Sequence, residues 1–403
     1  MRLSLPEGGA SASAFNDKRS GQSADTDGAR RQTMKHTLLC AAVIAALAAG
    51  TAAASETTLY GVLDYGMSLV NQHNTDGSRE NSAKMMSGQY IGSRFGLKGK
   101  ESLGGGLAVG YVLEGGISAD TGAMGQNGRL FGRDARLYIE GDFGHIGFGR
   151  MGSMVGGNGP YARFGHVVNA FSCGWGNVGG SLQVVSLGYE FIDNAVAYVT
   201  PKMGGVDAAF QYSFGSDSKS YGNGVEGKSS VERMYSAALR YQNETVLLVG
   251  GVESINQAQP AADTDRLDDA FSVNLGASWN AGWAKFYAYG QYFDSYAKAA
   301  KATMFGPAGG VDGYGVNVGA ETKALGGTVK ASFGFGDFEG NVKKDQTMKT
   351  YQTAAGYTYS LSRRTTLYTA AGWIHNDYSE VFKAADKGAE DVYEWIFGIV
   401  HKF

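Results

Sequence analysis

The run Tyr393-Glu-Trp-Ile-Phe-Gly-Ile-Val-His-Lys-Phe403 ends the chain, and large apolar side chains occupy every second position in it. Tyr393, Trp395, Phe397 and Ile399 share one parity, while Glu394 and Lys402 share the other. Successive side chains of a β-strand point to opposite faces of the sheet. The run therefore predicts a strand with one apolar face and one face that meets water.

The same two-residue period recurs from residue 58 onward. Leu59, Leu63, Tyr65, Met67 and Leu69 oppose Tyr60, Asp64 and Ser68; Phe286, Ala288 and Tyr292 oppose Lys285, Tyr287 and Gln291; Val329, Ala331, Phe333 and Phe335 oppose Lys330. No stretch of 18 apolar residues follows residue 55, so no transmembrane helix is predicted. These patterns indicate an all-β protein.

Connections between the predicted strands alternate in length. Short ones lie at 103–106, 142–144, 243–244, 280–282, 325–327 and 360–364, and long polar ones near 71–88, 119–130, 215–230, 256–270, 294–312, 338–350 and 376–390. Short turns at one end and long loops at the other are typical of an outer-membrane β-barrel. The pattern predicts a transmembrane antiparallel barrel of about sixteen strands.

Composition agrees with many short strands and tight turns, since the 403 residues include 62 Gly, 23 Tyr and 20 Phe but only 5 Pro. A secreted β-sandwich would also alternate, but aromatic residues at outward positions near strand ends, such as Tyr359, Trp373 and Trp395, favour the girdles of a membrane barrel. The formal net charge of −3 implies no face for nucleic acid.

The N-terminal region resembles an export signal that begins internally. Met34-Lys-His36 supplies a basic start, Leu38 to Ala49 an apolar stretch, and Ala52-Ala-Ala54 a small-residue cleavage site. We therefore predict upstream or extension sequence at 1–33, a signal peptide at 34–54 and the barrel at 55–403. Cys40 would leave with the signal, so Cys173 would have no intrachain partner for a disulfide.

Seven motifs in order resemble the general trimeric porins of Gram-negative bacteria, especially the β-proteobacterial branch. They are Thr58-Leu-Tyr-Gly-Val-Leu-Asp64, Ser93-Arg-Phe-Gly-Leu-Lys-Gly99, Glu101 to Leu107, Leu130-Phe-Gly-Arg133, Gly147-Phe-Gly-Arg150, Asp193 to Pro201, and His401-Lys-Phe403. The resemblance implies a homotrimer in the outer membrane, in contact with lipid and lipopolysaccharide, that passes small hydrophilic solutes and ions by diffusion. It also implies that Phe403 is an assembly signal.

In that family the third loop folds into the lumen and narrows it, and the matching stretch here is 151–180. A loop inside a lumen sets both the aperture and the local field. This stretch departs from the family pattern, because no Asp or Glu occurs between Asp142 and Glu190. Its ionisable candidates are Arg163 and His166, with Arg150 at its base.

The remaining candidate pore-lining residues lie on the predicted wall. Arg94 matches a basic position of the family, Arg133 matches a motif position but has outward parity near the mouth, and the others have lumen parity: Asp64, Lys98, Glu114, Arg136 and Glu140. Phe191 and Val400 stand where the family often has Arg. We therefore predict neutral to mildly anion-favouring selectivity.

Other kinds of site are poorly supported. Gly147 to Gly152 has the spacing of a dinucleotide-binding loop, but Val155-Gly-Gly-Asn-Gly-Pro160 follows and cannot carry the required helix. The histidines lack metal-ligand spacing, and the nearest catalytic pair, His375 with Asp377, is better explained as a polar loop. We predict no enzyme activity, cofactor or metal. A substrate-specific channel and a non-conducting adhesin barrel remain as alternatives.

Overall fold

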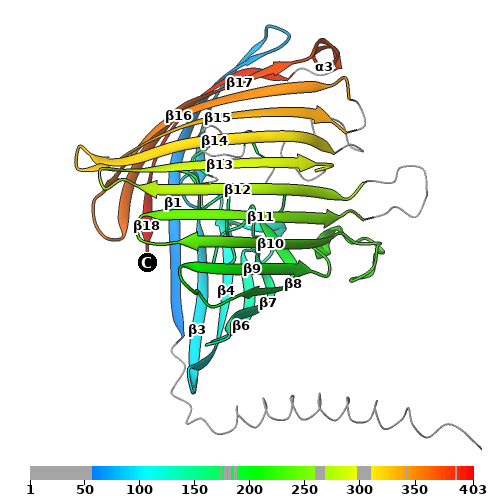
Figure 1. Ribbon diagram of the computed structural model, residues 1–403. Coiled ribbons are helices and arrows are strands. Elements are labelled where there is room, and N and C mark those ends of the chain that lie inside the picture. The colour runs from blue at the N-terminus through cyan, green and yellow to red at the C-terminus, as the bar shows by residue number, and fades with distance from the viewer. Residues whose placement is uncertain are drawn as a thin grey trace, which may run out of the picture. The chain divides into compact units, whose positions relative to one another are not determined.

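The computed structural model describes residues 57–172, 174–176, 179, 183–185, 188–258, 268–296, 310–341, 344–385 and 388–403. Their strands pair into a single antiparallel sheet that closes on itself (Figure 1). The strands are β1 (Thr58–Asn74), β2 (Arg79–Ser87), β3 (Arg94–Gly104), β4 (Leu107–Ser118), β5 (Ala123–Met124), β6 (Asp134–Gly141), β7 (Gly144–Gly152), β8 (Phe191–Val199), β9 (Val206–Ser213), β10 (Arg233–Gln242), β11 (Val246–Asn256), β12 (Ala270–Asn280), β13 (Ala284–Asp294), β14 (Val311–Ala324), β15 (Gly327–Gly340), β16 (Thr347–Ser360), β17 (Thr365–Tyr378) and β18 (Ala389–Lys402).

The eighteen strands of the described residues occupy sixteen positions in the wall. β2 and β3 pair with successive parts of β1 and form one interrupted wall strand, and β5 adds only two residues beside the end of β4. The predicted all-β antiparallel barrel of about sixteen strands is therefore confirmed. Short helical segments lie in the connections: α2 (Gly125–Gly128), η2 (Ser218–Ser220) and α3 (Glu380–Ala385).

The barrel closes where its two terminal strands meet. β1 pairs with β18 from Val62 opposite Lys402 to Asn74 opposite Ala389. Phe403 and Gly61 then exchange two backbone hydrogen bonds of 3.1 Å, each N–H donating to the other's carbonyl oxygen. Because a membrane interior offers no water to unpaired backbone groups, this pairing removes the free edges that an open sheet would present to lipid.

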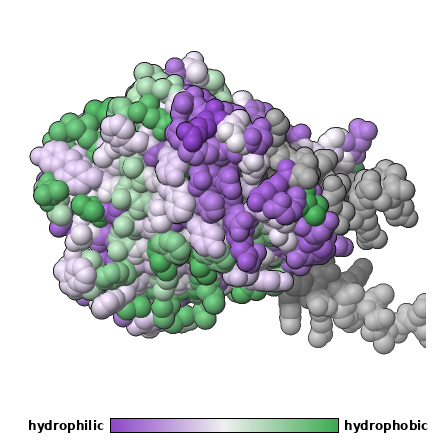
Figure 2. Space-filling view, turned by 90° about the horizontal axis from the view of Figure 1, so that it is seen from above, coloured by the Kyte–Doolittle hydropathy of each residue, from purple (hydrophilic) through white to green (hydrophobic). Residues whose placement is uncertain are grey.

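The wall reverses the distribution of apolar and polar side chains that is usual in a soluble protein. Large apolar side chains are exposed outside, for example Leu275 at 64% and Trp395 at 51%, while Asn274 and Glu394 beside them are buried inside at 0% and 3%. Figure 2 shows hydrophobic residues over much of one outer face, with hydrophilic residues gathered to one side. The outward parity predicted for the C-terminal run is confirmed, since Tyr393, Trp395 and Phe397 are all exposed.

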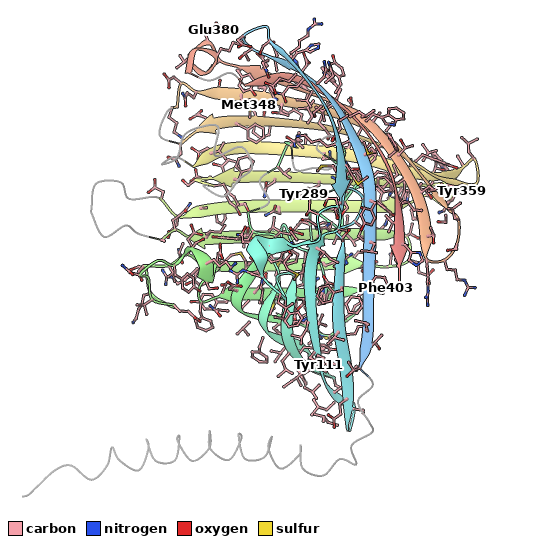
Figure 3. The ribbon with its side chains drawn as sticks, turned by 180° about the vertical axis from the view of Figure 1, so that it is seen from behind. Tyr111, Tyr289, Met348, Tyr359, Glu380 and Phe403 are labelled. Carbon is pink, nitrogen blue, oxygen red and sulfur yellow. The ribbon has the colours of Figure 1, made fainter. Side chains whose placement is uncertain are left out.

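The two ends of the barrel differ as the sequence predicted. Tight turns at one end use left-handed glycines, as at Gly104, Gly105 and Gly106. Longer connections lie at the other end; Tyr359 and Glu380 mark opposite ends of the β16–β18 region (Figure 3).

Three boundaries differ from prediction. Much of 71–88 is the β1–β2 hairpin rather than loop, the β15–β16 connection is only 341–346, and the wall is interrupted at 88–93. At the interruption the Asp64 carboxylate accepts hydrogen bonds from the backbone N–H groups of Tyr90 and Ile91, at 2.7 and 2.8 Å, in place of a strand ladder.

Among the described residues no helix is long and apolar enough to cross a membrane. The predicted extension at 1–33 and signal peptide at 34–54 lie outside the described residues.

A lipid-facing charge tests the orientation of the wall. Leu275 lies at the middle of β12 on the outer face, so Leu275→Arg should lower the free energy of unfolding by about 2–4 kcal/mol, the cost of a guanidinium at the bilayer midplane. The measurement is urea unfolding in phospholipid vesicles followed by tryptophan fluorescence. Ala281→Arg, in the turn after the same strand, is the control and should cost at most about 1 kcal/mol. Equal losses would contradict the assigned orientation.

Candidate functional site

A polar cavity of about 1120 Å³ lies inside the barrel. Side chains of β1, β3, β4 and β6 form one side of it, and those of β13, β14 and β15 form another. The chain between β7 and β8, residues 153–190 and here called the β7–β8 segment, supplies further lining, as do the β2–β3 interruption and the β4–β6 connection. The cavity therefore brings together residues that are more than 200 positions apart in the sequence.

One carboxylate organises the first side. Glu114 on β4 accepts a hydrogen bond of 2.8 Å from Nε of Arg133 and one of 2.9 Å from the hydroxyl of Tyr60. Arg94 on β3 lies 3.7 Å from the same carboxylate. Lys98 places its ammonium 5.2 Å from the centre of the Tyr60 ring. The predicted residues Arg94, Lys98, Glu114 and Arg133 are thus brought together.

The prediction that Arg133 has outward parity near the mouth is wrong. Its side chain is only 6% exposed, lines the cavity and lies over the ring of Phe191 at 5.0 Å. The physical reason is that β6 begins at Asp134, so Arg133 belongs to the bend before the strand and does not follow its alternation.

Arg136 lies on the same side, one step further along β6. Its guanidinium is 3.2 Å from a carboxylate oxygen of Asp134 and lies between the rings of Tyr138 and Tyr161, at 5.6 and 5.2 Å. Cation–π contacts of this kind stabilise a guanidinium that is largely removed from water. Asp134 was not among the predicted residues, although it lies two residues from Arg136 on the same face.

A second carboxylate organises the opposite part of the lining. Glu321 on β14 accepts hydrogen bonds from Nζ of Lys330 at 2.5 Å and from the hydroxyl of Tyr287 at 2.8 Å. Lys285 lies 4.8 Å from the centre of the Tyr287 ring. This group has the same arrangement as the first one. A lysine lies over a tyrosine ring, and the hydroxyl of that tyrosine donates a hydrogen bond to a glutamate that also binds a basic side chain. Inward parity had identified Lys285 and Lys330, but nothing in the sequence linked them to Glu321.

The β7–β8 segment carries two of the predicted residues, which have different roles. Arg163 is only 1% exposed and binds Asp207 at 3.3 Å, next to Arg240, whose Nη2 is 2.7 Å from the same carboxylate. It therefore joins the segment to β9 and does not line the cavity. His166 does line it, and burial together with the charges of Arg133 and Arg94 lowers the pKa of His166 to about 4. Its imidazole is neutral at pH 7.

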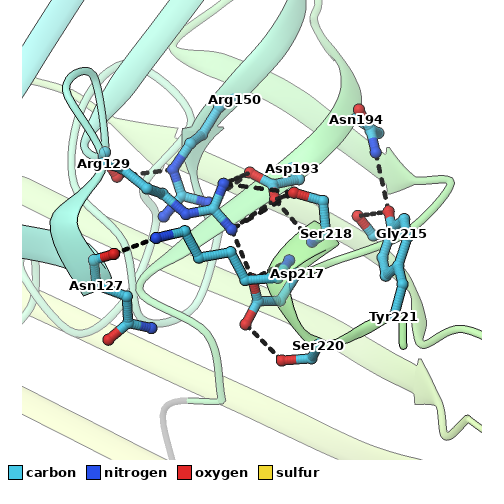
Figure 4. Close-up of polar contacts among 12 residues, drawn as sticks. Asn127, Arg129, Arg150, Asp193, Asn194, Gly215, Asp217, Ser218, Ser220 and Tyr221 are labelled. Carbon is cyan, nitrogen blue, oxygen red and sulfur yellow. Dashed lines mark hydrogen bonds and ion pairs between the residues drawn. The ribbon is translucent and has the colours of Figure 1, made fainter. Parts of the chain in front are cut away.

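Arg150, predicted at the base of the loop, belongs to a separate network (Figure 4). Its guanidinium lies 2.6 Å from Asp193 on β8. Arg129 binds both Asp193 and Asp217, at 3.0 and 2.7 Å, and the backbone N–H of Ser218 donates to Asp193 at 2.8 Å. The network ties the β4–β6 connection to the start of β8 and to the β9–β10 connection.

The last two predicted wall residues are engaged in local contacts. Asp64 is buried and also accepts a hydrogen bond of 2.8 Å from the hydroxyl of Tyr368. Glu140 binds Lys100 and lies 3.3 Å from Nδ1 of His145. Neither carboxylate belongs to the lining of this cavity.

His375 and Asp377 lie in strand β17, so their interpretation as part of a polar loop is wrong. Nδ1 of His375 lies 3.0 Å from Asp391, and its ring stacks on Trp373 at 5.7 Å. These side chains have outward parity on β17 and β18. Within the described part of the chain, no group of three His, Cys, Asp or Glu side chains is placed to hold a metal ion.

Asp207 is the shared ion-pair partner of Arg163, which is buried, and of Arg240, which is partly exposed. Asp207→Asn leaves Arg163 and Arg240 without a counter-charge, and should lower the free energy of unfolding by about 3 kcal/mol because a buried uncompensated charge is costly. The same vesicle unfolding experiment measures it, with Asp142→Asn in the exposed β6–β7 turn as the matched control. If both variants unfold like the parent, Asp207 does not compensate these arginines.

Comparisons with known proteins agree with this geometry. The sequence profile described as Gram-negative porin matches residues 40–379. An outer membrane porin protein of Bordetella pertussis is 29% identical over 377 residues, covering 85% of this chain and 95% of that protein. Outer membrane porin protein 32 of Delftia acidovorans is also 29% identical, over 381 residues that cover 88% and 93% of the two chains.

Solved structures share the fold. The anion-selective porin from Comamonas acidovorans superposes with a TM-score of 0.65 at 24% identity, covering 87% of this chain and all of that one. OmpT of Vibrio cholerae superposes with a TM-score of 0.56 at 14% identity, covering 87% of this chain and 98% of that one. Because the family profile spans most of the sequence and the wall closes as a barrel, this chain belongs to the Gram-negative porin family of outer-membrane channels, which are not enzymes.

Proposed function

We propose that the cavity beside the β7–β8 segment is the narrowest part of this channel and that it gives passive diffusion a weak preference for anions. The chain is an outer-membrane porin, through which small hydrophilic solutes diffuse. The observation that carries the proposal is the charge of the lining. Five bases line the cavity, namely Arg94, Arg133, Arg136, Lys285 and Lys330, against four acids, namely Glu114, Asp134, Glu190 and Glu321.

Hydrogen bonding leaves this small excess of positive charge unchanged, because each paired glutamate is matched by one of the counted bases. Glu114 and Glu321 each accept bonds from a tyrosine hydroxyl and from a basic side chain, so their oxygens are already occupied. The β7–β8 segment adds no carboxylate before Glu190, and its His166 is neutral at pH 7. Wall charges set ion selectivity in a wide, wet pore. The name of the Comamonas acidovorans structure, an anion-selective porin, gives independent support.

We also propose a homotrimer, with outer-membrane lipid and lipopolysaccharide around it. Family resemblance supports this assembly. The exposed basic side chain of Lys349, near the loop end of β16, would be placed to meet lipopolysaccharide phosphates.

A substrate-specific channel is the second candidate. Tyr60, Tyr90 and Tyr287 reach the same cavity, although they are dispersed in the sequence. Aromatic faces beside charged groups would bind a particular solute in addition to admitting ions. Conductance that saturates with one solute would favour this candidate over general diffusion.

Reversal potentials in planar bilayers under a KCl gradient test the charge preference. We expect the chloride-to-potassium permeability ratio to exceed one modestly, and Lys285→Gln to lower it by about two-fold because the lining loses one positive charge. Lys228→Gln, in the exposed β9–β10 connection, should leave it unchanged. A clear cation preference in the parent would overturn the anion proposal, and a complete lack of conductance would favour an adhesin.

The state of His166 gives a prediction about pH. Because its pKa is lowered to about 4, the imidazole stays uncharged at pH 7 and gains a positive charge only as the pH falls through about 4. His166→Gln should therefore match the parent reversal potential at pH 7, whereas at pH 4 the parent should favour anions more than the variant does. A difference at pH 7 would mean that the imidazole is charged there.

A further inference from the structure

Six glycines on the inner face of the wall lie where the β7–β8 segment touches it. They are here called the glycine belt: Gly251 on β11, Gly276 on β12, Gly315 and Gly319 on β14, Gly334 on β15 and Gly356 on β16. Parity places them inward, because Gly276 lies between buried Asn274 and Ser278. Five strands of the wall thus present bare backbone to one segment.

A side chain at any belt position would meet this segment. A Cβ on Gly276 would lie 2.7 and 2.9 Å from the two methyl carbons of Val168, and one on Gly319 would lie 2.9 Å from Cβ of Ala170. On Gly315 it would fall on the carbonyl oxygen of Val184. Such distances are shorter than non-bonded carbon contacts allow, so the segment would have to move.

The segment meets the belt with apolar side chains. Phe164, Val168, Ala170, Phe171 and Val184 are each at most 3% exposed. β13 contributes no glycine to the belt. Its inward residue Tyr289 stacks instead on Phe164, with 6.0 Å between the ring centres. Figure 3 shows Tyr289 among the inner side chains. This side of the segment is packed like a protein core, although it lies inside a water-filled barrel.

Polar contacts help to fix the position of the segment along the wall. Asn169 donates a hydrogen bond of 3.0 Å to Asn317, and Nζ of Lys330 donates one of 2.7 Å to the carbonyl of Ala170. These two contacts lie next to Gly319. Backbone approach at glycine and hydrogen bonds beside it together hold the segment against β14 and β15.

We infer that the glycine belt sets the aperture of this channel. Because its residues lack side chains, the segment can pack directly on the wall, so the aperture depends on the volume at the belt positions and not on their charge. The inference rests on the proposed role of the cavity as the narrowest part of the channel. Phe164, Val168 and Val184 pack against the belt and take no part in the cavity lining, whereas His166 and Ser172 of the same segment line the cavity. Any group added at the belt therefore displaces the segment toward the cavity and narrows the path for water.

Replacing one belt glycine with alanine tests this directly. Gly276→Ala adds one methyl group against Val168, and we expect single-channel conductance in planar bilayers to fall about two-fold as the segment moves into the path. Gly290→Ala is the matched control. It lies on β13 with outward parity, its nearest side-chain neighbour is Val316 at 3.8 Å, and its conductance should equal that of the parent.

A compensating change separates repositioning from general damage to the wall. Val168→Ala removes the two methyl carbons of the segment that the new Cβ would touch and leaves only the contact with Cγ1 of Val249 in the wall, at 3.0 Å. The double variant Gly276→Ala/Val168→Ala should therefore recover most of the lost conductance. Folding of every variant is checked by heat-dependent mobility in gels. If the parent conducts and Gly276→Ala conducts equally, or if Val168→Ala gives no recovery, the inference is wrong. A parent that does not conduct would instead contradict the proposed function.

Discussion

Closure of one sheet between lipid and water is the constraint on which the rest of this structure depends. Every backbone group at membrane depth needs a partner within the wall, and pairing of β1 with β18 supplies the last set. Once the sheet is closed, alternation along each strand is enough to place every second side chain toward lipid and the others toward the interior of the barrel. Exposed Leu275 and buried Asn274 are neighbours in sequence because each faces a different solvent.

Alternation explains why much of the fold could be predicted from the sequence. It requires only strand geometry, so the outward run from Tyr393 to Ile399 and the short turns were identified correctly. It failed where the strand stops: Arg133 lies in a bend, and the break between β2 and β3 depends on hydrogen bonds to Asp64 that have no local signature. Parity is informative only within an unbroken strand.

The candidate site was harder to predict because its roles depend on partners distant in the sequence. Arg163 was a candidate for the lumen, yet Asp207 holds it in a buried ion pair. Glu321 was missed because only the closed sheet brings it to the same cavity as Arg94. The sequence predicts which residues point inward, while the packing of the β7–β8 segment decides which of them still meet water.

The pairing of Glu114 and Glu321, each with a tyrosine hydroxyl and a basic side chain, has a consequence for how the charge of such a channel can change. Glu114 holds Arg94 and Arg133, so exchange of this one acid for a neutral residue would leave two cations without their shared counter-charge. Exchange of a base would have the opposite effect. Single codon changes can therefore alter the charge of the channel lining, at a cost in stability where the released cation is as buried as Arg133.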